Sequence, residues 1–492
     1  MLKGLETDVL KAVQDIIRQK KTKMIVVEDI KGILKSGANG GGSISNGGST
    51  TIDAPVEQKG VVLMDPTPKV NTGEGVDGYV MLFKSRYEKT MRILAQRPDS
   101  KRISRIATVK MMNGKGNNNG GNGRRVTAAG HDERSLNGGA GNSFVVAGLL
   151  MSRRTKKNGV ELEIDDYTGR MSVLAASEDA KKQASMLALD QMVMLELENA
   201  GGVAGLAVKS VFSPDIPDHL PAKSKSEAYA VLISDMHVGS KYFMEKEFLA
   251  FLDWLCASED DDIVRKIKFL CIGGDLIDGI GIFPNQDKEL LMTDATSQMA
   301  HAAMLLSKIP KHIKTYIIPG NHDPGRRALP QPAFPQATSG GMYNLENCTM
   351  LGNPAYVELN GVKVLMFHGQ SLDDVIATTP GLSYQKPAEA MKVLLKARHL
   401  SPVYGERTPV APEGEDMMVM TEVPDIFHSG HVHVTDVDSY RGTLVVNSGA
   451  WQAQTKFQQT MGITPSPGIA IVVNLATLQP FKQDFNFNQK QQ

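Results

Sequence analysis

The chain has 492 residues, of which 41% are hydrophobic and 22% are charged, and its formal net charge is zero. This length exceeds one ordinary domain and suggests about three, and the composition is typical of a soluble globular protein. Zero net charge excludes a chain that binds nucleic acid through its overall charge. Such binding would need a local basic patch, a metal site or a partner.

The three cysteines, Cys256, Cys271 and Cys348, are odd in number and have no CxxC spacing. They are typical of reduced core thiols in an intracellular protein, not of a disulfide framework or a zinc knuckle. The start of the sequence has no apolar signal-peptide core, and no run reaches the ~18 apolar residues of a membrane span. We therefore expect a cytoplasmic protein that makes no membrane contact.

The first part of the chain alternates helical and flexible stretches. Residues 1–36 predict a small N-terminal helical unit, which either docks a partner or is an appendage with no separate role. Residues 37–75 are rich in Gly, Ser, Asn and Pro and predict a flexible linker. Residues 76–109 predict an amphipathic helical segment, with a helix over Tyr79–Gln96 whose basic side is typical of a solvated face. Residues 110–142, dominated by Gly and Asn, predict a disordered linker.

Residues 143–222 predict a small β-domain. Five short strands and one helix within about 80 residues are typical of an OB-type barrel. The predicted strands are Phe144–Met151, Val160–Ile164, Arg170–Ala175, Val193–Leu197 and Leu206–Phe212, with a helix over Glu178–Leu189. OB barrels often bind single strands through aromatic and basic residues. These strands are poor in aromatics, so docking of another protein is an equally good interpretation.

Residues 223–492 alternate apolar strands with helical stretches, which predicts an α/β domain. Five of its strands end in polar residues, at the sheet edge where α/β proteins build their sites. These residues are Asp235 and His237 after Tyr229–Ser234, Asp275 and Asp278 after Ile267–Ile272, Asn321, His322 and Asp323 after Thr315–Ile318, His368 after Val362–Phe367, and His431 and His433 after Asp425–Phe427.

Each strand end taken alone has an ordinary explanation. An Asp or Asn can cap the next helix, and a lone His after a strand is more often a satisfied buried residue than a ligand. Five such ends in one half of the chain make coincidence a poor explanation of the whole set. We interpret Asp323 as turn chemistry, and His428 and His301 as structural.

The order D-x-H, GDxxD, GNHD, H and GHxH resembles the calcineurin-like metallophosphoesterase superfamily over about residues 225–475. The resemblance implies a layered α-β-β-α fold and two divalent metal ions. It implies that Asp235, His237, Asp275 and His433 hold one ion, and that Asp275, Asn321, His368 and His431 hold the other. It also implies that His322 acts as general acid or transition-state stabiliser, with Asp278 as its orienting carboxylate.

The chemistry of a phosphoesterase requires such a set, because two metal ions can share a hydroxide and neutralise charge on the phosphate oxygens. Mixed oxygen and nitrogen ligands without thiolates favour Mn, Fe or Zn. We expect Mn, with Mg, Fe or Zn as alternatives.

Several longer stretches resemble the small subunits of archaeal family D DNA polymerases. They are PGRRALPQP after Asp323, HGQSLDDVI at His368–Ile376, PGLSY at Pro380–Tyr384, the stretch Leu394–Glu413 and NSGAWQAQTKFQQ at Asn447–Gln459. This resemblance implies a 3′–5′ exonuclease that proofreads DNA 3′ ends or single strands, in a heterodimer with a large polymerase subunit. Other replication factors are further candidate partners.

Every metal position of the motif set is filled, which argues for an active nuclease. A scaffold subunit with little nuclease activity is the alternative, and the predicted barrel disfavours a stand-alone phosphatase or repair nuclease. Arg326 and Arg327, just past the GNHD turn, are candidate phosphate contacts, or else part of a solvated loop.

Overall fold

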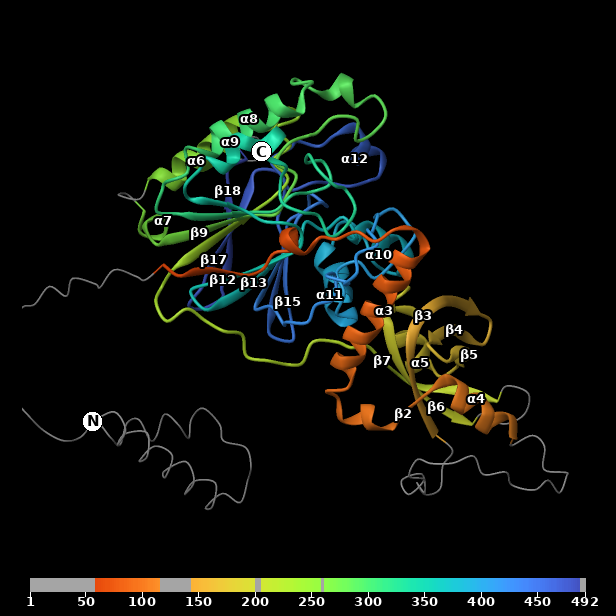
Figure 1. Ribbon diagram of the computed structural model, residues 1–492. Helices are drawn as coiled ribbons and strands as arrows, with labels where there is room; N and C mark the ends of the chain where they lie inside the picture. The colour runs from red at the N-terminus through yellow and green to blue at the C-terminus, as the bar shows by residue number, and fades with distance from the viewer. Residues whose placement is uncertain (1–57, 116–142, 200–204, 258–260, 487–492) are drawn as a thin grey trace, which may run out of the picture. The chain divides into compact units, whose positions relative to one another are not determined.

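The computed structural model describes residues 58–115, 143–199, 205–257 and 261–486 (Figure 1). The predicted helical unit 1–36 and most of the predicted linker 110–142 lie outside these ranges. The first residues of that predicted linker, 110–115, instead belong to helix α4 (Ile106–Lys115). Among the described residues, no helix is long and apolar enough to cross a lipid bilayer.

Two six-stranded sheets form the larger part of the described chain. The first has the order β11-β10-β9-β8-β17-β18 and the second the order β1-β12-β13-β14-β16-β15. Strands β8 to β11 are parallel to one another, as are β13, β14 and β16, so their carboxyl ends share an edge within each sheet. The strands of the first sheet are β8 (Tyr229–Ile233), β9 (Ile267–Ile272), β10 (Lys314–Ile317), β11 (Cys348–Met350), β17 (Ile469–Asn474) and β18 (Pro480–Asp484). Those of the second are β1 (Gly60–Met64), β12 (Ala355–Leu359), β13 (Val362–Met366), β14 (Ile426–Ser429), β15 (Asp436–Tyr440) and β16 (Thr443–Asn447).

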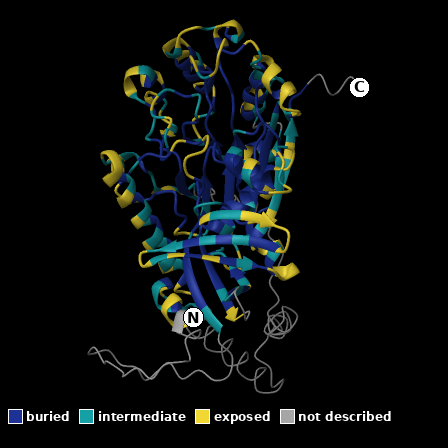
Figure 2. Cartoon of the chain, turned by 90° about the vertical axis from the view of Figure 1, so that its right-hand side faces the viewer, coloured by how far each residue is buried: buried dark blue, intermediate teal, exposed yellow. Residues whose placement is uncertain are grey.

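The sheets face each other across a shared apolar core, in which Leu232 and Cys271 of the first pack in one cluster with Val364 and Ile426 of the second. Helices cover the outer face of each sheet. They are α6 (Glu245–Cys256), α8 (Ala295–Leu306) and α9 (Gln336–Tyr343) on the first sheet, and α10 (Leu372–Thr378) and α11 (Pro387–Ala397) on the second. The short helices α7 (Asp262–Arg265) and α12 (Lys456–Thr460) and the 3-10 turn η4 (Gln286–Glu289) lie in connections. The layers are therefore α-β-β-α. Strands that are buried on both faces consist mainly of apolar residues, and Figure 2 shows the buried residues in dark blue.

Residues 143–212 form a closed five-stranded barrel with the order β3-β4-β5-β7-β6, in which β6 pairs back onto β3. Its elements are β3 (Ser143–Lys156), β4 (Gly159–Asp166), β5 (Gly169–Ala175), α5 (Glu178–Ser185), β6 (Met192–Asn199) and β7 (Leu206–Phe212), with β2 (Ile103–Ser104) added alongside β3. Alternate residues of β4, such as Leu162 and Ile164, point into the barrel core. The side chain of Ser177 caps α5 by accepting from the N–H of Ala180.

The predicted linker 37–75 is wrong in its last part. Gly60–Met64 forms strand β1, which pairs antiparallel with the edge strand β12. The apolar run GVVLM suits a strand, and the side chain of Gln58 anchors its start by donating to the carbonyls of Lys268 and His312. The 3-10 turn η1 (Thr67–Lys69) follows. The α/β sheet therefore includes residues from outside the predicted domain 223–492.

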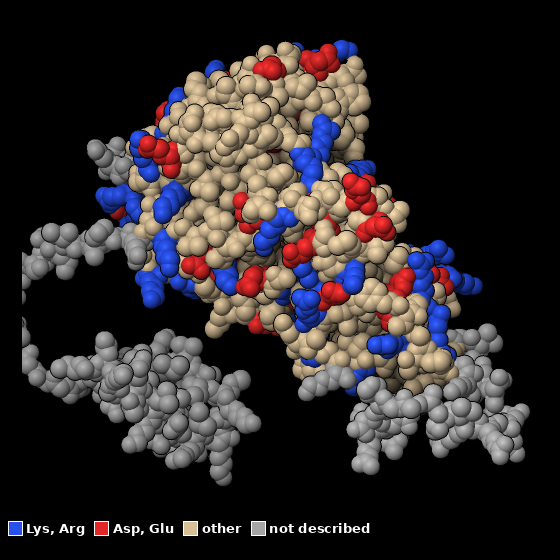
Figure 3. Space-filling view, viewed as in Figure 1, with Lys and Arg blue, Asp and Glu red and all other residues tan. Residues whose placement is uncertain are grey.

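Helix α3 (Gly75–Leu94) corresponds to the predicted amphipathic helix, and the 3-10 turn η2 (Pro98–Arg102) follows it. The expectation of a solvated basic face is wrong at Arg86, whose side chain is only 1% exposed. Its Nε lies 2.9 Å from a carboxylate oxygen of Asp416, and its Nη1 donates to the carbonyl of Pro402. The helix is therefore attached to the layered part by a buried ion pair. On the face seen in Figure 3, Lys and Arg are interspersed with Asp and Glu.

Candidate metal centre

The polar residues predicted at the five strand ends form two adjacent clusters. Asp235, His237 and His433 offer ligand atoms within 4.8 Å of one another, and so do Asp275, His368 and His431. Because β8, β9 and β10 are parallel in one sheet and β13 and β14 in the other, the turns that follow them meet at one edge of the layered core.

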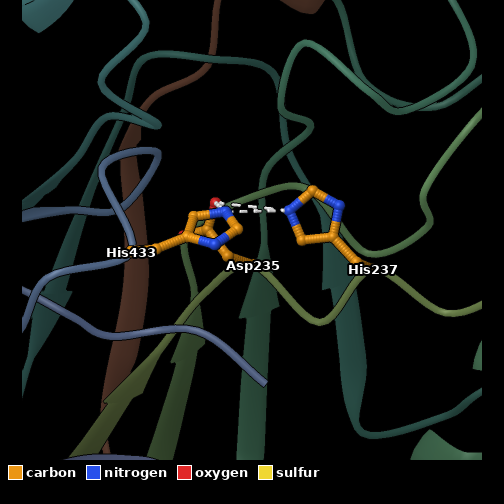
Figure 4. Close-up of side chains that lie close together, drawn as sticks. All are labelled: Asp235, His237 and His433. Carbon is orange, nitrogen blue, oxygen red and sulfur yellow. Dashed lines mark hydrogen bonds and ion pairs between the residues drawn. The ribbon is translucent and has the colours of Figure 1, made fainter. Parts of the chain in front are cut away.

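The first cluster joins the ends of β8 and β14. The Nε2 atoms of His237 and His433 are 3.0 Å apart, and the Nε2 of His433 is 3.5 Å from Oδ1 of Asp235. Figure 4 shows these three side chains directed toward one another. All three are buried.

The second cluster joins the ends of β9, β13 and β14, and Asn321 lies beside it after the end of β10. The Nε2 of His368 lies 3.3 Å from Oδ2 of Asp275 and 3.0 Å from Oδ1 of Asn321. The same Oδ2 of Asp275 is 3.8 Å from Nε2 of His237 in the first cluster. Asp275 is therefore placed between the two clusters.

The backbone of these turns is unusual. Asp235, His237, Asp275, His431 and His433 all have φ between 50° and 69°, a left-handed conformation that costs roughly 1–3 kcal/mol at a non-glycine residue. Such conformations concentrate where a site requires them. Glycines make room beside them: a Cβ at residue 320 would collide with the carboxylate of Asp275, and one at residue 430 with that of Asp235.

The donor set suits divalent cations. Burying carboxylates is costly unless they are paired or coordinate a metal, and here Asp235 and Asp275 lie among imidazoles rather than Lys or Arg. Burial raises the pKa of Asp275, but the neighbouring His368, His322 and His237 outweigh it and hold that pKa well below its usual range. Burial lowers the pKa of His368, but Asp275 and Asp235 outweigh it and raise that pKa to about 9. Carboxylate oxygens and imidazole nitrogens are ligands that Mn, Fe and Zn accept.

Three of the imidazoles are fixed through their second ring nitrogen. Nδ1 of His237 lies 3.1 Å from Oδ1 of Asp278, Nδ1 of His368 lies 2.8 Å from the carbonyl oxygen of Gly273, and Nδ1 of His433 lies 2.8 Å from Nε2 of Gln458. The oxygen partners of His237 and His368 accept from Nδ1–H, which orients these rings and leaves Nε2 as the ligand atom, as in metal-ligating histidines. The amide nitrogen of Gln458 instead donates to Nδ1 of His433, so it fixes that ring but places the proton of the neutral imidazole on Nε2. In each ring the Nε2 atom faces its cluster.

His322 lies beside both clusters but is held differently from the prediction. Its Nδ1 is 2.8 Å from the main-chain carbonyl oxygen of Asp278, and its main-chain N–H donates to Oδ1 of Asp275. The carboxylate of Asp278 contacts His237 instead, and accepts from Nε2 of Gln286 and Nε2 of Gln452. The prediction that the carboxylate of Asp278 orients His322 is therefore wrong, because these amide donors hold that carboxylate against His237. The carbonyl of the same residue takes the role.

The predicted phosphate contact of Arg326 is not supported, because its guanidinium is already occupied. Nη1 of Arg326 lies 2.6 Å from Oε1 of Glu413, a carboxylate only 1% exposed that needs a cationic partner, and also donates to Thr72. Arg327 is exposed, and its phosphate contact stays a prediction.

Asp323 accepts from the N–H groups of Gly320 and Ile277, which agrees with a role in the turn. Burial and the neighbouring Asp275 raise its pKa to about 7. His428 is buried with Nε2 2.9 Å from Oγ of Ser448, and His301 pairs with Glu245. Neither histidine is a member of the metal-ligand clusters found among the described residues.

Residues that the sequence did not single out complete the site. Asp373 places Oδ2 3.2 Å from Nε2 of His431. Gln458 bonds to His433, and Gln286 and Gln452 bond to Asp278, as described above. The amides carry no charge and have no motif spacing, so no sequence signal marked them. Asp373 lies in the stretch HGQSLDD, which indicated the family resemblance but no role for this carboxylate. Both clusters open into a cavity of about 190 Å³.

Layered sheets with a buried carboxylate–imidazole site at their strand ends define an α/β protein with a candidate metal centre. Residues 230–435 match the family model that describes the B subunits of DNA polymerases alpha and epsilon. The chain is 37% identical over 429 residues to the DNA polymerase II small subunit of Pyrococcus furiosus, over 84% of this chain and 65% of that relative. It is 37% identical over 431 residues to the small subunit of Archaeoglobus fulgidus, over 85% of this chain and 78% of that relative.

The chain therefore belongs to the family of archaeal DNA polymerase II small subunits, which confirms the resemblance seen in the sequence. It spans about 65% of the length of the Pyrococcus relatives. Solved structures similar to part of the fold include an archaeal phosphodiesterase, with a TM-score of 0.27 at 12% identity over 52% of this chain and 98% of that one. Another is a zinc complex of Vps29 from Entamoeba histolytica, with a TM-score of 0.26 at 12% identity over 52% of this chain and 99% of that one. At such TM-scores the family assignment rests on the sequence relatives.

Proposed function

We propose that this chain is the small subunit of a replicative DNA polymerase complex and that it carries a two-metal 3′–5′ exonuclease that proofreads DNA. The observation that supports this most is Asp275, whose one carboxylate oxygen lies 3.3 Å from His368 and 3.8 Å from His237. A carboxylate shared by two ligand clusters is what a pair of closely spaced metal ions needs. The names of the relatives support pairing with a large polymerase subunit.

In this proposal the first ion is held by Asp235, His237, Asp275 and His433, and the second by Asp275, Asn321, His368 and His431. Mn is the expected metal. Two such ions supply an activated water and neutralise charge on the phosphate oxygens. The buried carboxylates and the fixed Nε2 atoms of the chain set where these ions would lie.

His322 then handles the proton of the leaving group. In exonucleolytic hydrolysis, water attacks phosphorus, the bond from phosphorus to the 3′ oxygen breaks, and that oxygen must gain a proton. The carbonyl of Asp278 accepts from Nδ1–H of His322, which directs Nε2 of the ring to the cavity that it lines. The ring acts as the acid in its doubly protonated form, gives the proton on Nε2 to the 3′ oxygen, and keeps the proton on Nδ1. A positioned acid of this kind contributes roughly 10²–10⁴ in rate.

The barrel supports a second part of the proposal. The order β3-β4-β5-β7-β6 in the sheet, with α5 between β5 and β6 in the sequence, supports an OB-type barrel. We assign it to residues 143–222. Its role is to hold either single-stranded DNA or the large subunit.

The test is a nuclease assay of the purified chain with Mn on a 5′-labelled single strand, alone and with its large subunit. Stepwise shortening from the 3′ end is expected. No removal of nucleotides in either setting would contradict the exonuclease. The Asp275→Ala variant should no longer shorten the strand but should still bind the large subunit. If the wild type is inactive while wild type and variant both bind the large subunit, the scaffold alternative holds.

A further inference from the structure

The cavity that contains the two clusters has an unusual lining. Apart from Tyr384, its ionisable side chains are histidines and the carboxyl groups of Asp275, Asp278, Glu289 and Asp373, and none of the described Lys or Arg residues lines it. Proteins usually hold nucleic acid strands by neutralising phosphates with basic side chains. Within this described lining the metal clusters are the place for a phosphate, so the rest of a bound nucleotide needs another kind of contact.

Aromatic rings supply that contact. Phe283, Tyr384 and Phe457 line the same cavity. Phe457 is 66% exposed and Phe283 is 37% exposed, and they are the only exposed phenylalanines among the residues that the structure describes. A phenylalanine exposed to this degree adds little to a core, and exposed apolar side chains that line one cavity together mark a ligand-binding surface.

Phe457 is tied directly to the first cluster. It lies in α12, and its neighbour Gln458 is buried with Nε2 2.8 Å from Nδ1 of His433. The Oε1 of Gln458 also accepts from the main-chain N–H of Thr455, the N-cap of the helix, in a capping box. The helix is thereby fixed against a candidate metal ligand, and the backbone of Phe457 is fixed with it.

Phe283 is held in a similar way from a different segment. It lies in the connection between β9 and η4, three residues before the buried Gln286. The side chain of Gln286 accepts from the N–H of Ile282 and donates to the carboxylate of Asp278. Both exposed rings are therefore carried by short segments whose glutamines bond to the residues of the site.

We propose that Phe457, together with Phe283, stacks on the unpaired terminal base of a DNA 3′ end whose last phosphodiester lies at the metal clusters. This rests on the proposed function and adds how the substrate is recognised. Stacking accepts every base, because each has a π-face, which suits an enzyme that must remove any nucleotide. A base can stack on a ring only after it has left the duplex, so the rings select ends that are single-stranded or frayed.

The test uses the full chain, Mn and an oligonucleotide with 2-aminopurine at its 3′ end and a phosphorothioate as its last linkage. Stacking quenches 2-aminopurine, so wild-type chain should lower its fluorescence on binding. The Phe457→Ala variant should lose the quenching and weaken binding by roughly tenfold, and Phe457→Trp should restore both. Met461→Ala is the matched control, because Met461 follows the same helix and is 42% exposed but does not line the cavity.

A second arm compares hydrolysis of ordinary 3′ ends with ends whose terminal nucleotides are abasic. Phe457→Ala should slow hydrolysis of the ordinary end and leave the abasic end unchanged. Quenching without hydrolysis by the wild type would remove the proposed exonuclease and keep the stacking site. Absence of quenching by the wild type, or a Phe457→Ala variant that binds and cleaves like the wild type, would overturn the stacking site.

Discussion

At the scale of single residues, Asp278 serves two neighbours through two different groups. Its main-chain carbonyl holds Nδ1 of His322, and its carboxylate holds Nδ1 of His237. A side-chain substitution changes only the second contact. The proposed proton-handling role of His322 and the proposed metal-holding role of His237 can therefore be separated by mutation.

For His322, replacement by Ala should lower kcat by roughly 10²–10⁴-fold, because the leaving oxygen loses its proton source. Metal content should stay the same, since His322 is not among the proposed ligands. Turnover assays with elemental analysis of the same samples check this. A variant that loses its metal would show that His322 is a ligand.

For Asp278, replacement by Asn keeps the carbonyl and removes the charge that faces His237. We expect Mn affinity to fall by roughly 10–100-fold, as for other outer partners of ligating histidines. Calorimetric titration of the apo protein measures it. Unchanged Mn affinity would mean that the carboxylate positions the amides of Gln286 and Gln452 rather than His237.

The sequence predicted the residues that form the two clusters, because D-x-H, GNHD and GHxH carry their candidate ligands within four positions of a strand end. It could not predict the direction of the Asp278 carboxylate or the pairing of Arg326 with Glu413. These depend on partners that are 174 and 87 residues away. Several of those partners are uncharged amides, which leave no pattern in a sequence.

At the scale of elements, a buried ion pair is one of the contacts that attach α3. Both members of the pair between Arg86 and Asp416 are almost fully buried, at 1% and 0% exposure. Periodicity predicted the helix, but not that a basic side chain would be turned inward, because the acidic partner is 330 residues further on. The strand β1 was missed for a similar reason, since its neighbours in sequence read as a linker.

Replacing Arg86 by Met should lower the free energy of unfolding by about 3–5 kcal/mol, because the buried charge of Asp416 loses its cationic partner. Denaturant unfolding measures this. The control is Arg92→Met in the same helix, whose side chain is 76% exposed and only 3.9 Å from Glu88; it should cost less than about 1 kcal/mol. Equal costs for the two variants would contradict the role of the buried pair.

At the scale of the whole molecule, the barrel and the layered part share contacts that the sequence did not indicate. The main-chain N–H of Tyr404 donates to the carboxylate of Asp190, and the guanidinium of Arg153 donates to the carbonyl of Thr378. Near this junction His399 is buried, with Nε2 2.9 Å from Oδ2 of Asp416. Stability of the described structure should therefore respond to the protonation of this histidine.

Burial, helped by the charge of Arg86, lowers the pKa of His399 to about 4. In the unfolded chain the pKa of His is about 6.5. Between these values the unfolded chain binds a proton that the folded chain does not, so stability is lost as pH falls from about 6.5 toward 4, by on the order of 3 kcal/mol. Urea unfolding across this range measures it, and His399→Gln should flatten the dependence. An equal slope in the variant would assign the loss to other groups.

The position of β1 has a consequence for dividing the protein. The polypeptide contributes β1 to the second sheet, leaves to build the barrel, and returns at β8 to complete both sheets. In topological terms the barrel is an insertion within the α/β domain, not a module placed before it. A fragment that begins at residue 223 would leave β12 with a bare edge of unpaired N–H and C=O groups, which invites self-association. Removing the barrel by internal excision, rather than truncating the chain from its N-terminal side, therefore leaves this sheet whole.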